Sequence, residues 1–135
     1  MFYTYPIAVP ANTAKADAQE TELKLDHGVI HRLSIGFPSG CEGLAHVKLL
    51  VGLHQLWPTS SDEDFALDDH NLEWDDYFEL KDTPYTLTAV AWNEDETYPH
   101  TITVRIGVLP LEVYWREGRS AALVTALAKA FGLAG

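Results

Sequence analysis

The sequence has few of the residues with which small domains are commonly cross-linked. Only one of its 135 residues is a cysteine, Cys41, so no internal disulfide can form and no set of cysteines can hold zinc. We expect Cys41 to act as a small buried hydrophobic residue. A single domain of this length buries roughly two-thirds of the surface that its unfolded chain exposes. The chain is therefore long enough to fold around a hydrophobic core without such a cross-link.

Basic residues are also scarce. Nine Lys and Arg stand against twenty Asp and Glu, which gives a formal net charge of −11. Nucleic acids and anionic membranes attract proteins through Lys and Arg, so this balance argues against nucleic acid and membrane as partners. No stretch approaches the roughly 18 apolar residues that a membrane-spanning helix requires. Residues 1–10 lack the basic and uninterrupted apolar segments of a signal peptide, so we expect synthesis in the cytoplasm.

Alternating apolar residues predict a series of β-strands. Residues 20–26 and 29–37 each place their apolar side chains on one face, as a half-buried strand does. Residues 2–9 contain Pro6, which suits an edge strand or an N-terminal arm better than a central strand. Further extended segments are expected at residues 44–51, 53–57, 84–92 and 98–109. The last two predict a hairpin with a polar connection over 93–97.

Turn residues at intervals of about ten positions predict an all-β fold, an antiparallel β-sandwich or jelly roll of about seven to eight strands. We expect an arm and loop over residues 1–19, the sandwich over 20–110 and an extension over 111–135. Ser120 is a suitable N-cap for one short C-terminal helix. The apolar residues of that helix include Leu123, Val124, Leu127 and Phe131. They would pack on their own sandwich or on another subunit, and both alternatives stay open.

Acidic residues cluster in one part of the chain. Residues 62–82 carry ten of the twenty acids and a single Lys, and we expect residues 58–70 to form an acidic loop. A run of like charge usually marks a solvated surface. The alternative is a calcium site, because carboxylates are hard oxygen ligands, although the loop lacks the spacing of an EF-hand. Its ligands would be Asp62, Asp64, Asp68 and Asp69. No resident metal or cofactor is predicted.

The sequence offers no complete catalytic set. None of the six histidines forms a His-x-His pair, and Cys41 and Ser39 lack the flanking pattern of a catalytic nucleophile. We expect hydrogen-bonded structural histidines and no enzymatic activity. An enzyme would need a cleft that gathers His and carboxylates from separate strands. Trp57 and Trp74, beside the acids, suggest a different class of protein, a carbohydrate- or calcium-binding adhesion module.

Four segments carry a family resemblance: GVIHRLSIGFPSGCEGL at 28–44, QLWP at 55–58, AWNE at 91–94 and HTITVRI at 100–106. They resemble small β-proteins from the structural modules of tailed phages. The chain is most similar to capsid decoration (cement) proteins of the β-sandwich or β-tulip kind. This resemblance implies a virion protein without catalytic residues, often trimeric, that binds neighbouring capsomers from outside. A tail, neck or fibre component is the alternative, because decoration proteins do not generally require an apolar C-terminal helix.

The resemblance also implies protein partners and an interface. The partners would be capsid or other virion proteins and further copies of the same chain. We expect the contacts to come from the N-terminal arm and from the apolar side of the C-terminal helix. The arm would supply Phe2, Tyr3, Tyr5 and Ile7, and the helix Leu123, Val124, Leu127 and Phe131.

Overall fold

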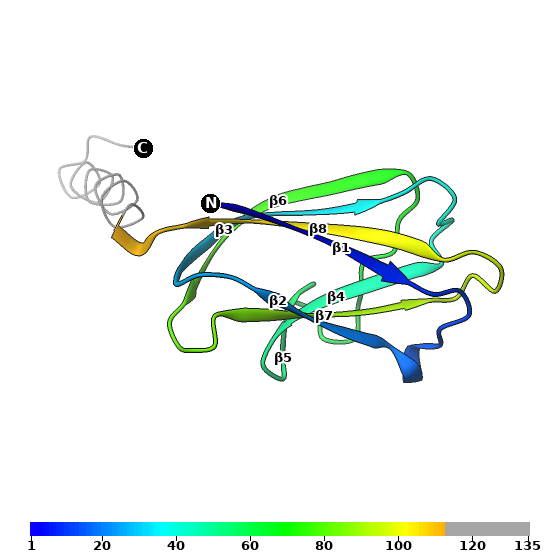
Figure 1. Cartoon of the computed structure of the whole chain (residues 1–135), viewed down its shortest axis with the longest axis horizontal. Helices are drawn as coiled ribbons and strands as arrows, with labels where there is room; N and C mark the ends of the chain where they lie inside the picture. The colour runs from blue at the N-terminus through cyan, green and yellow to red at the C-terminus, as the bar shows by residue number, and fades with distance from the viewer. Residues whose placement is uncertain (113–135) are drawn as a thin grey trace, which may run out of the picture.

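The computed structural model describes residues 1–112, which form eight strands in two antiparallel sheets. The strands are β1 (Phe2–Val9), β2 (Gln19–Lys24), β3 (Gly28–Phe37), β4 (Ala45–Val51), β5 (His54–Trp57), β6 (His70–Leu80), β7 (Thr86–Asn93) and β8 (His100–Leu109). One sheet has the order β1-β8-β3-β6 and the other β2-β7-β4-β5, and Figure 1 shows them as two layers. The predicted all-β, sandwich-like architecture is confirmed. The predicted C-terminal helix lies outside the described residues.

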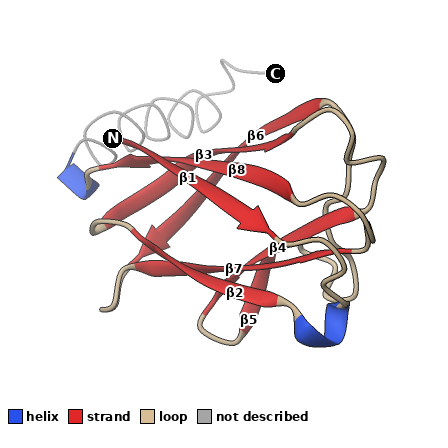
Figure 2. Ribbon diagram, turned by 45° about the vertical axis from the view of Figure 1, so that its right-hand side comes forward, coloured by secondary structure: helices blue, strands red, loops and turns tan. Residues whose placement is uncertain are grey.

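Strands that are far apart in the sequence pair in a regular way. β1 pairs with β8, β2 with β7, β3 with β6 and β4 with β5, all antiparallel. The pairs β3–β8 and β4–β7 join these four ribbons into the two sheets. The chain therefore follows the path of one long double-stranded ribbon folded over on itself, and its two layers face each other in Figure 2.

The core lies between the sheets and follows from the alternation of each strand. In β8 the side chains of Ile102, Val104, Ile106 and Val108 are fully buried. The intervening residues Thr101 and Arg105 are exposed on the outer face. Burying one such aliphatic side chain stabilises the fold by about 1.5–3 kcal/mol. Cys41 is fully buried as predicted, and burial raises the pKa of its thiol.

Residues 2–9 form an edge strand and no free arm. β1 pairs with β8 along its whole length, from Phe2 opposite Gly107 to Val9 opposite His100. Ile7 is 1% exposed and belongs to the core. The prediction of Ile7 as an interface anchor is therefore wrong, because its position in the strand turns the side chain inward. The edge-strand alternative, which rested on Pro6, is confirmed.

The predicted hairpin between the last two strands is also wrong. β7 and β8 lie in different sheets, and the connection between them crosses from one layer to the other. A buried Asn93 holds this connection, since its Nδ2 donates to the carbonyl of Tyr98 at 2.9 Å and its Oδ1 accepts from the amide of Asp95 at 3.0 Å. Alternation defines which face of a strand is buried, but it does not define the partner strand.

The acidic segment is half loop and half strand. Residues 58–69 form a loop, which a backbone bridge between Phe65 and Val47 ties to β4 with hydrogen bonds of 2.9 and 3.0 Å. Residues 70–80 form β6, an edge strand that was not predicted. In β6 Leu72 and Trp74 pack toward the other sheet, while Glu73 is exposed. Within residues 1–112, no helix has the length and apolar character needed to cross a membrane.

Candidate binding face

The outer face of sheet β1-β8-β3-β6 carries the candidate site. Side chains alternate between the two faces of a strand, so the register defines which residues share this surface. Three rows cross the four strands, and their members are Phe2, Gly107, Arg32 and Asp75, then Thr4, Arg105, Ser34 and Glu73, then Pro6, Thr103, Gly36 and Asn71. The face thus combines two arginines, two carboxylates, hydroxyl and amide groups, and one aromatic ring.

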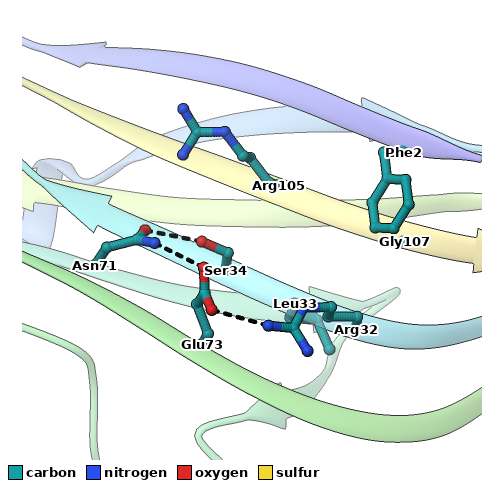
Figure 3. Close-up of a pocket in the computed structure, with 8 residues that line it drawn as sticks. All are labelled: Phe2, Arg32, Leu33, Ser34, Asn71, Glu73, Arg105 and Gly107. Carbon is teal, nitrogen blue, oxygen red and sulfur yellow. Dashed lines mark hydrogen bonds and ion pairs between the residues drawn. The ribbon is translucent and has the colours of Figure 1, made fainter.

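A chain of hydrogen bonds fixes one side of this face. Ser34 Oγ donates to Asn71 Oδ1 at 2.8 Å, and Asn71 Nδ2 donates to Glu73 Oε1 at 2.9 Å. Arg32 donates from Nη2 to Glu73 Oε2 at 2.8 Å and from Nη1 to Asp75 Oδ1 at 3.1 Å. These ion pairs are about half exposed, so each adds less than about 1 kcal/mol to stability. Their main effect is to hold the five polar side chains in defined positions, and Figure 3 shows the part of the network formed by Ser34, Asn71, Glu73 and Arg32.

Arg105 differs from Arg32 in its surroundings. Its guanidinium lies on β8 beside Ser34 and is exposed, and within residues 1–112 no carboxylate or carbonyl pairs with it. A guanidinium has five N–H donors, and none of them has a protein acceptor in this part of the chain. Figure 3 shows the side chain of Arg105 extending along the sheet without a contact to the bonded network. As far as residues 1–112 are concerned, the site therefore has a cationic donor group that is not used by the protein itself.

Two adjoining hollows follow the face along β8. The first, of about 330 Å³, is lined by Phe2 and Gly107 at one end. The second, of about 430 Å³, extends to Thr101 at the other end. Both hollows are lined by Asn71 and Arg105, so they adjoin at these two side chains, and we refer to the two hollows together as the groove.

Gly36 keeps the middle of this groove open. A Cβ atom at this position would lie 3.5 Å from Asn71 Oδ1 and 3.8 Å from Arg105 Nη1, which is ordinary contact distance. A side chain is therefore sterically acceptable at residue 36 but would occupy the groove. At the far end, the ring of Phe2 lies over Gly107 and meets His31 edge-on at 5.9 Å. Phe2 is 72% exposed, so most of its ring faces solvent.

The structure does not bring together the predicted calcium ligands, Asp62, Asp64, Asp68 and Asp69. Asp64 Oδ1 lies 2.6 Å from His46 Nδ1. Asp68 Oδ1 accepts the backbone amides of Gly40 and Glu42, both at 3.0 Å. Within residues 1–112, no three His, Cys, Asp or Glu side chains gather where they could hold a metal ion. Two of the four carboxylates thus fix the loop to β4 and to the turn after β3.

Trp57 and Trp74, the tryptophans predicted to stack on sugars, pack at the edge of the hydrophobic core. Trp57 is 5% exposed, and its indole N–H donates to Asp76 Oδ2 at 2.7 Å. Its ring packs against Trp74 and Phe78 at centroid distances of 6.5 and 6.1 Å, and Trp74 packs in turn against Phe65 at 5.2 Å. A saccharide therefore has no access to the face of Trp57, while Trp74 is half-buried.

Two histidines have the hydrogen-bonded structural role that was expected. His46 is held by Asp64, and its ring stacks on Trp92 at 5.0 Å. His100 Nε2 lies 2.8 Å from Asp95 Oδ2. The carboxylate of Asp95 is hydrogen-bonded to the backbone amide of Thr97, to the ring of His100 and to the backbone amide of Tyr98. These hydrogen bonds lower the pKa of the Asp95 carboxyl.

The predicted arm anchors Tyr3 and Tyr5 bind their own domain. The hydroxyl of Tyr3 donates to the carboxylate of Asp26, and that of Tyr5 donates to the backbone carbonyl of Lys24. The hydrogen bond to Asp26 raises the pKa of Tyr3 to about 12. These bonds close the gap between the edges β1 and β2. Of the predicted anchors, Phe2 is the one that stays largely exposed, and those on the helix lie beyond residue 112.

Comparisons with protein-family models, with curated proteins and with solved structures found no match to this chain.

Proposed function

We propose that the protein is a non-enzymatic structural protein of a virus particle, a capsid decoration protein that acts by binding the shell. One observation carries the proposal, namely the acidic edge strand β6. This strand is 11 residues long, and among the strands of residues 1–112 it pairs with β3 alone, so no other strand in that part of the chain covers its second edge. An open edge presents unpaired N–H and C=O groups and can accept a strand or an extended segment from a partner.

The charge of this edge defines its partner. β6 contains four acids and no Lys or Arg, and the preceding loop over 58–69 adds five more acids. Two copies of this edge would repel each other, because like charges would face one another across the contact. We infer that the edge binds a basic surface of another protein and not a second copy. Association of copies into a trimer, which the resemblance implies, would use other surfaces and stays a prediction.

The strand pairing supports the same proposal. We propose that the fold is a jelly roll, since β1 to β4 pair in turn with β8 to β5 as a folded ribbon requires. Jelly rolls occur in viral capsid proteins and in lectins. One fold can carry many functions, so the pairing adds weight only in combination with the acidic edge.

The experiment measures binding to shells. Virus particles from the source of this chain are stripped of peripheral proteins, mixed with the purified protein and sedimented. The test variant reverses two charges on β6, Asp75→Lys with Glu79→Lys. The matched control reverses two exposed charges on β2, Glu20→Lys with Glu22→Lys. We expect the wild type and the control to sediment with the shells, the test variant to stay in solution, and added salt to release the bound protein.

Two results would refute the proposal. One is a wild-type protein that does not sediment with the shells. The other is a folded β6 variant that binds as well as the wild type. Sedimentation with isolated tails instead of shells would favour the tail or neck alternative.

A further inference from the structure

We propose that the groove on the outer face of sheet β1-β8-β3-β6 binds a saccharide whose carboxylates are few and separated by neutral sugars, with Arg105 as the partner of one carboxylate. This binding activity goes beyond the proposed shell contact and does not depend on it. It uses the face of the sheet, whereas the shell contact uses the open edge of β6.

The charged groups of the groove leave one guanidinium for a ligand. Arg32, Arg105 and Glu73 line the first hollow and Asp69 lines the second, so the two positive and two negative charges of the lining balance. Arg32 is already bonded to Glu73 and Asp75. Arg105 is the guanidinium whose donors have no acceptor within residues 1–112. A guanidinium binds a carboxylate through two parallel hydrogen bonds, so this groove is complementary to one such group.

The shape of the groove suits an elongated ligand. It runs along β8 from Gly107 to Thr101, a distance of about 20 Å at the usual rise of a strand. Gly36 keeps its centre open between Asn71 and Arg105. The groove is therefore elongated and open at the surface, which suits a segment of several sugar rings.

The groups that line the groove favour a saccharide over a peptide. The groups around Arg105 are side-chain hydroxyls and an amide, from Ser34, Thr103 and Asn71, and these can bond to sugar hydroxyls. The backbone groups of β8 and β3 are already used in the sheet, so the face offers an extended peptide no main-chain ladder. The exposed ring of Phe2 supplies an apolar platform at one end. Polar groups beside one aromatic platform favour a sugar chain.

The net charge of the protein limits the charge of the ligand. The whole chain carries a net charge of −11, so its long-range field repels a ligand with many negative charges. One carboxylate neutralises the local charge at Arg105, but a sulfated polymer would add repulsion from the acids around the groove. The groove is therefore expected to select a sparsely charged saccharide over a densely charged one.

The experiment uses the full chain and three tetrasaccharide probes. The test probe is a hyaluronan tetrasaccharide, in which hexuronate alternates with a neutral amino sugar. The probes for comparison are the neutral tetramer of N-acetylglucosamine and a sulfated heparin tetrasaccharide. Binding is measured by titration calorimetry, and its location by shifts of backbone amide resonances. We expect the hyaluronan probe to bind about tenfold or more tightly than either of the others, with the largest shifts at Gly36 and Gly107.

Three variants test the residues. Arg105→Ala should weaken binding of the hyaluronan probe by about tenfold or more, because it removes a charged hydrogen-bonding partner. Gly36→Val places a branched side chain in the groove at a position where a Cβ atom meets its neighbours at ordinary contact distance, so it should abolish binding, and its melting temperature is measured to show that it is folded. Lys24→Ala removes the same charge from an exposed site on β2 and serves as the matched control, with unchanged affinity.

Several results would overturn the proposal. The first is no binding of the hyaluronan probe to the wild type, and the second is equal binding of the neutral or sulfated probe. A third is unchanged affinity in a folded Arg105→Ala or Gly36→Val variant. Finally, equal affinity for a blocked Gly-Glu-Gly peptide would show that the groove binds carboxylates of peptides as well as of sugars, and would also refute it. None of these results bears on the sedimentation experiment with shells.

Discussion

The hydrogen bond between Trp57 and Asp76 should be a principal link between the acidic strand and the core. Trp57 ends β5 in one sheet, and Asp76 lies in β6 of the other sheet. The donor and acceptor atoms are 2.7 Å apart, and the indole is 5% exposed. Because the acceptor is charged and the donor is buried, loss of either partner leaves the other without its hydrogen bond in a place with little water.

The expected magnitude follows from these contacts. A hydrogen bond to a charged group contributes about 1.5–3 kcal/mol, and a buried group without its partner costs about 1–3 kcal/mol. We therefore expect Trp57→Phe and Asp76→Leu each to lower the free energy of unfolding by about 2 kcal/mol. For a domain of this size, that corresponds to a fall in melting temperature of roughly 6–10 °C. The double variant removes both partners, so it should lose about 1–2 kcal/mol less than the sum of the single variants.

The assay is urea unfolding of the four proteins, followed by circular dichroism. A control cycle combines Trp57→Phe with Lys24→Ala, which is exposed on β2, and should be additive within about 0.5 kcal/mol. A coupling between Trp57 and Asp76 that is no larger than this control value would refute the reasoning. The two side chains would then be adjacent without stabilising each other.

Three further predictions concern stability and titration. The pKa of the Asp95 carboxyl is lowered in the folded protein, so its hydrogen bonds stabilise the fold above the unfolded pKa. This stabilisation is lost as the pH falls through the folded pKa. Between about pH 5 and 2, the free energy of unfolding should therefore fall more in the wild type than in Asp95→Asn, as measured by urea denaturation. Asp26→Asn should lower the pKa of Tyr3 from about 12 toward its ordinary value, measured from tyrosinate absorbance with Tyr3→Phe as the reference. Because the raised pKa favours the neutral phenol, this bond stabilises the fold below the ordinary pKa of tyrosine and is lost as the pH rises through the native value. Leu49→Ala empties a fully buried site and should lower the unfolding free energy by about 2–5 kcal/mol in the same denaturation assay.

Alternation predicted most of the strands, because a strand with one buried face places its apolar residues at every second position. The exception was β6. Its inward residues Leu72, Trp74 and Phe78 carry a usable signal, but the acids between them were interpreted as a loop. A high density of charge is compatible with a strand when the charges occupy its outward positions, and the structure shows that arrangement here.

Pairing and the candidate site could not be predicted from the sequence. The alternation of β8 placed Arg105 among the outward residues, and this much was visible. Its neighbours Ser34 and Asn71 come from strands that are distant in the sequence, and only the register brings the three together. The false hairpin between β7 and β8 has the same origin, since proximity in the chain was taken as proximity in the sheet.

The pairing of the first strand with the last has a consequence for synthesis of the protein. Of the eight strands, β1 is synthesised first, yet its partner β8 is completed 100 residues later, at residue 109. At a translation rate of about 5–20 residues per second, β1 waits roughly 5–20 s for its partner. During that time its edge is open to other chains. Pro6 removes one backbone donor from the middle of β1, which makes the waiting strand a poorer template for aggregation.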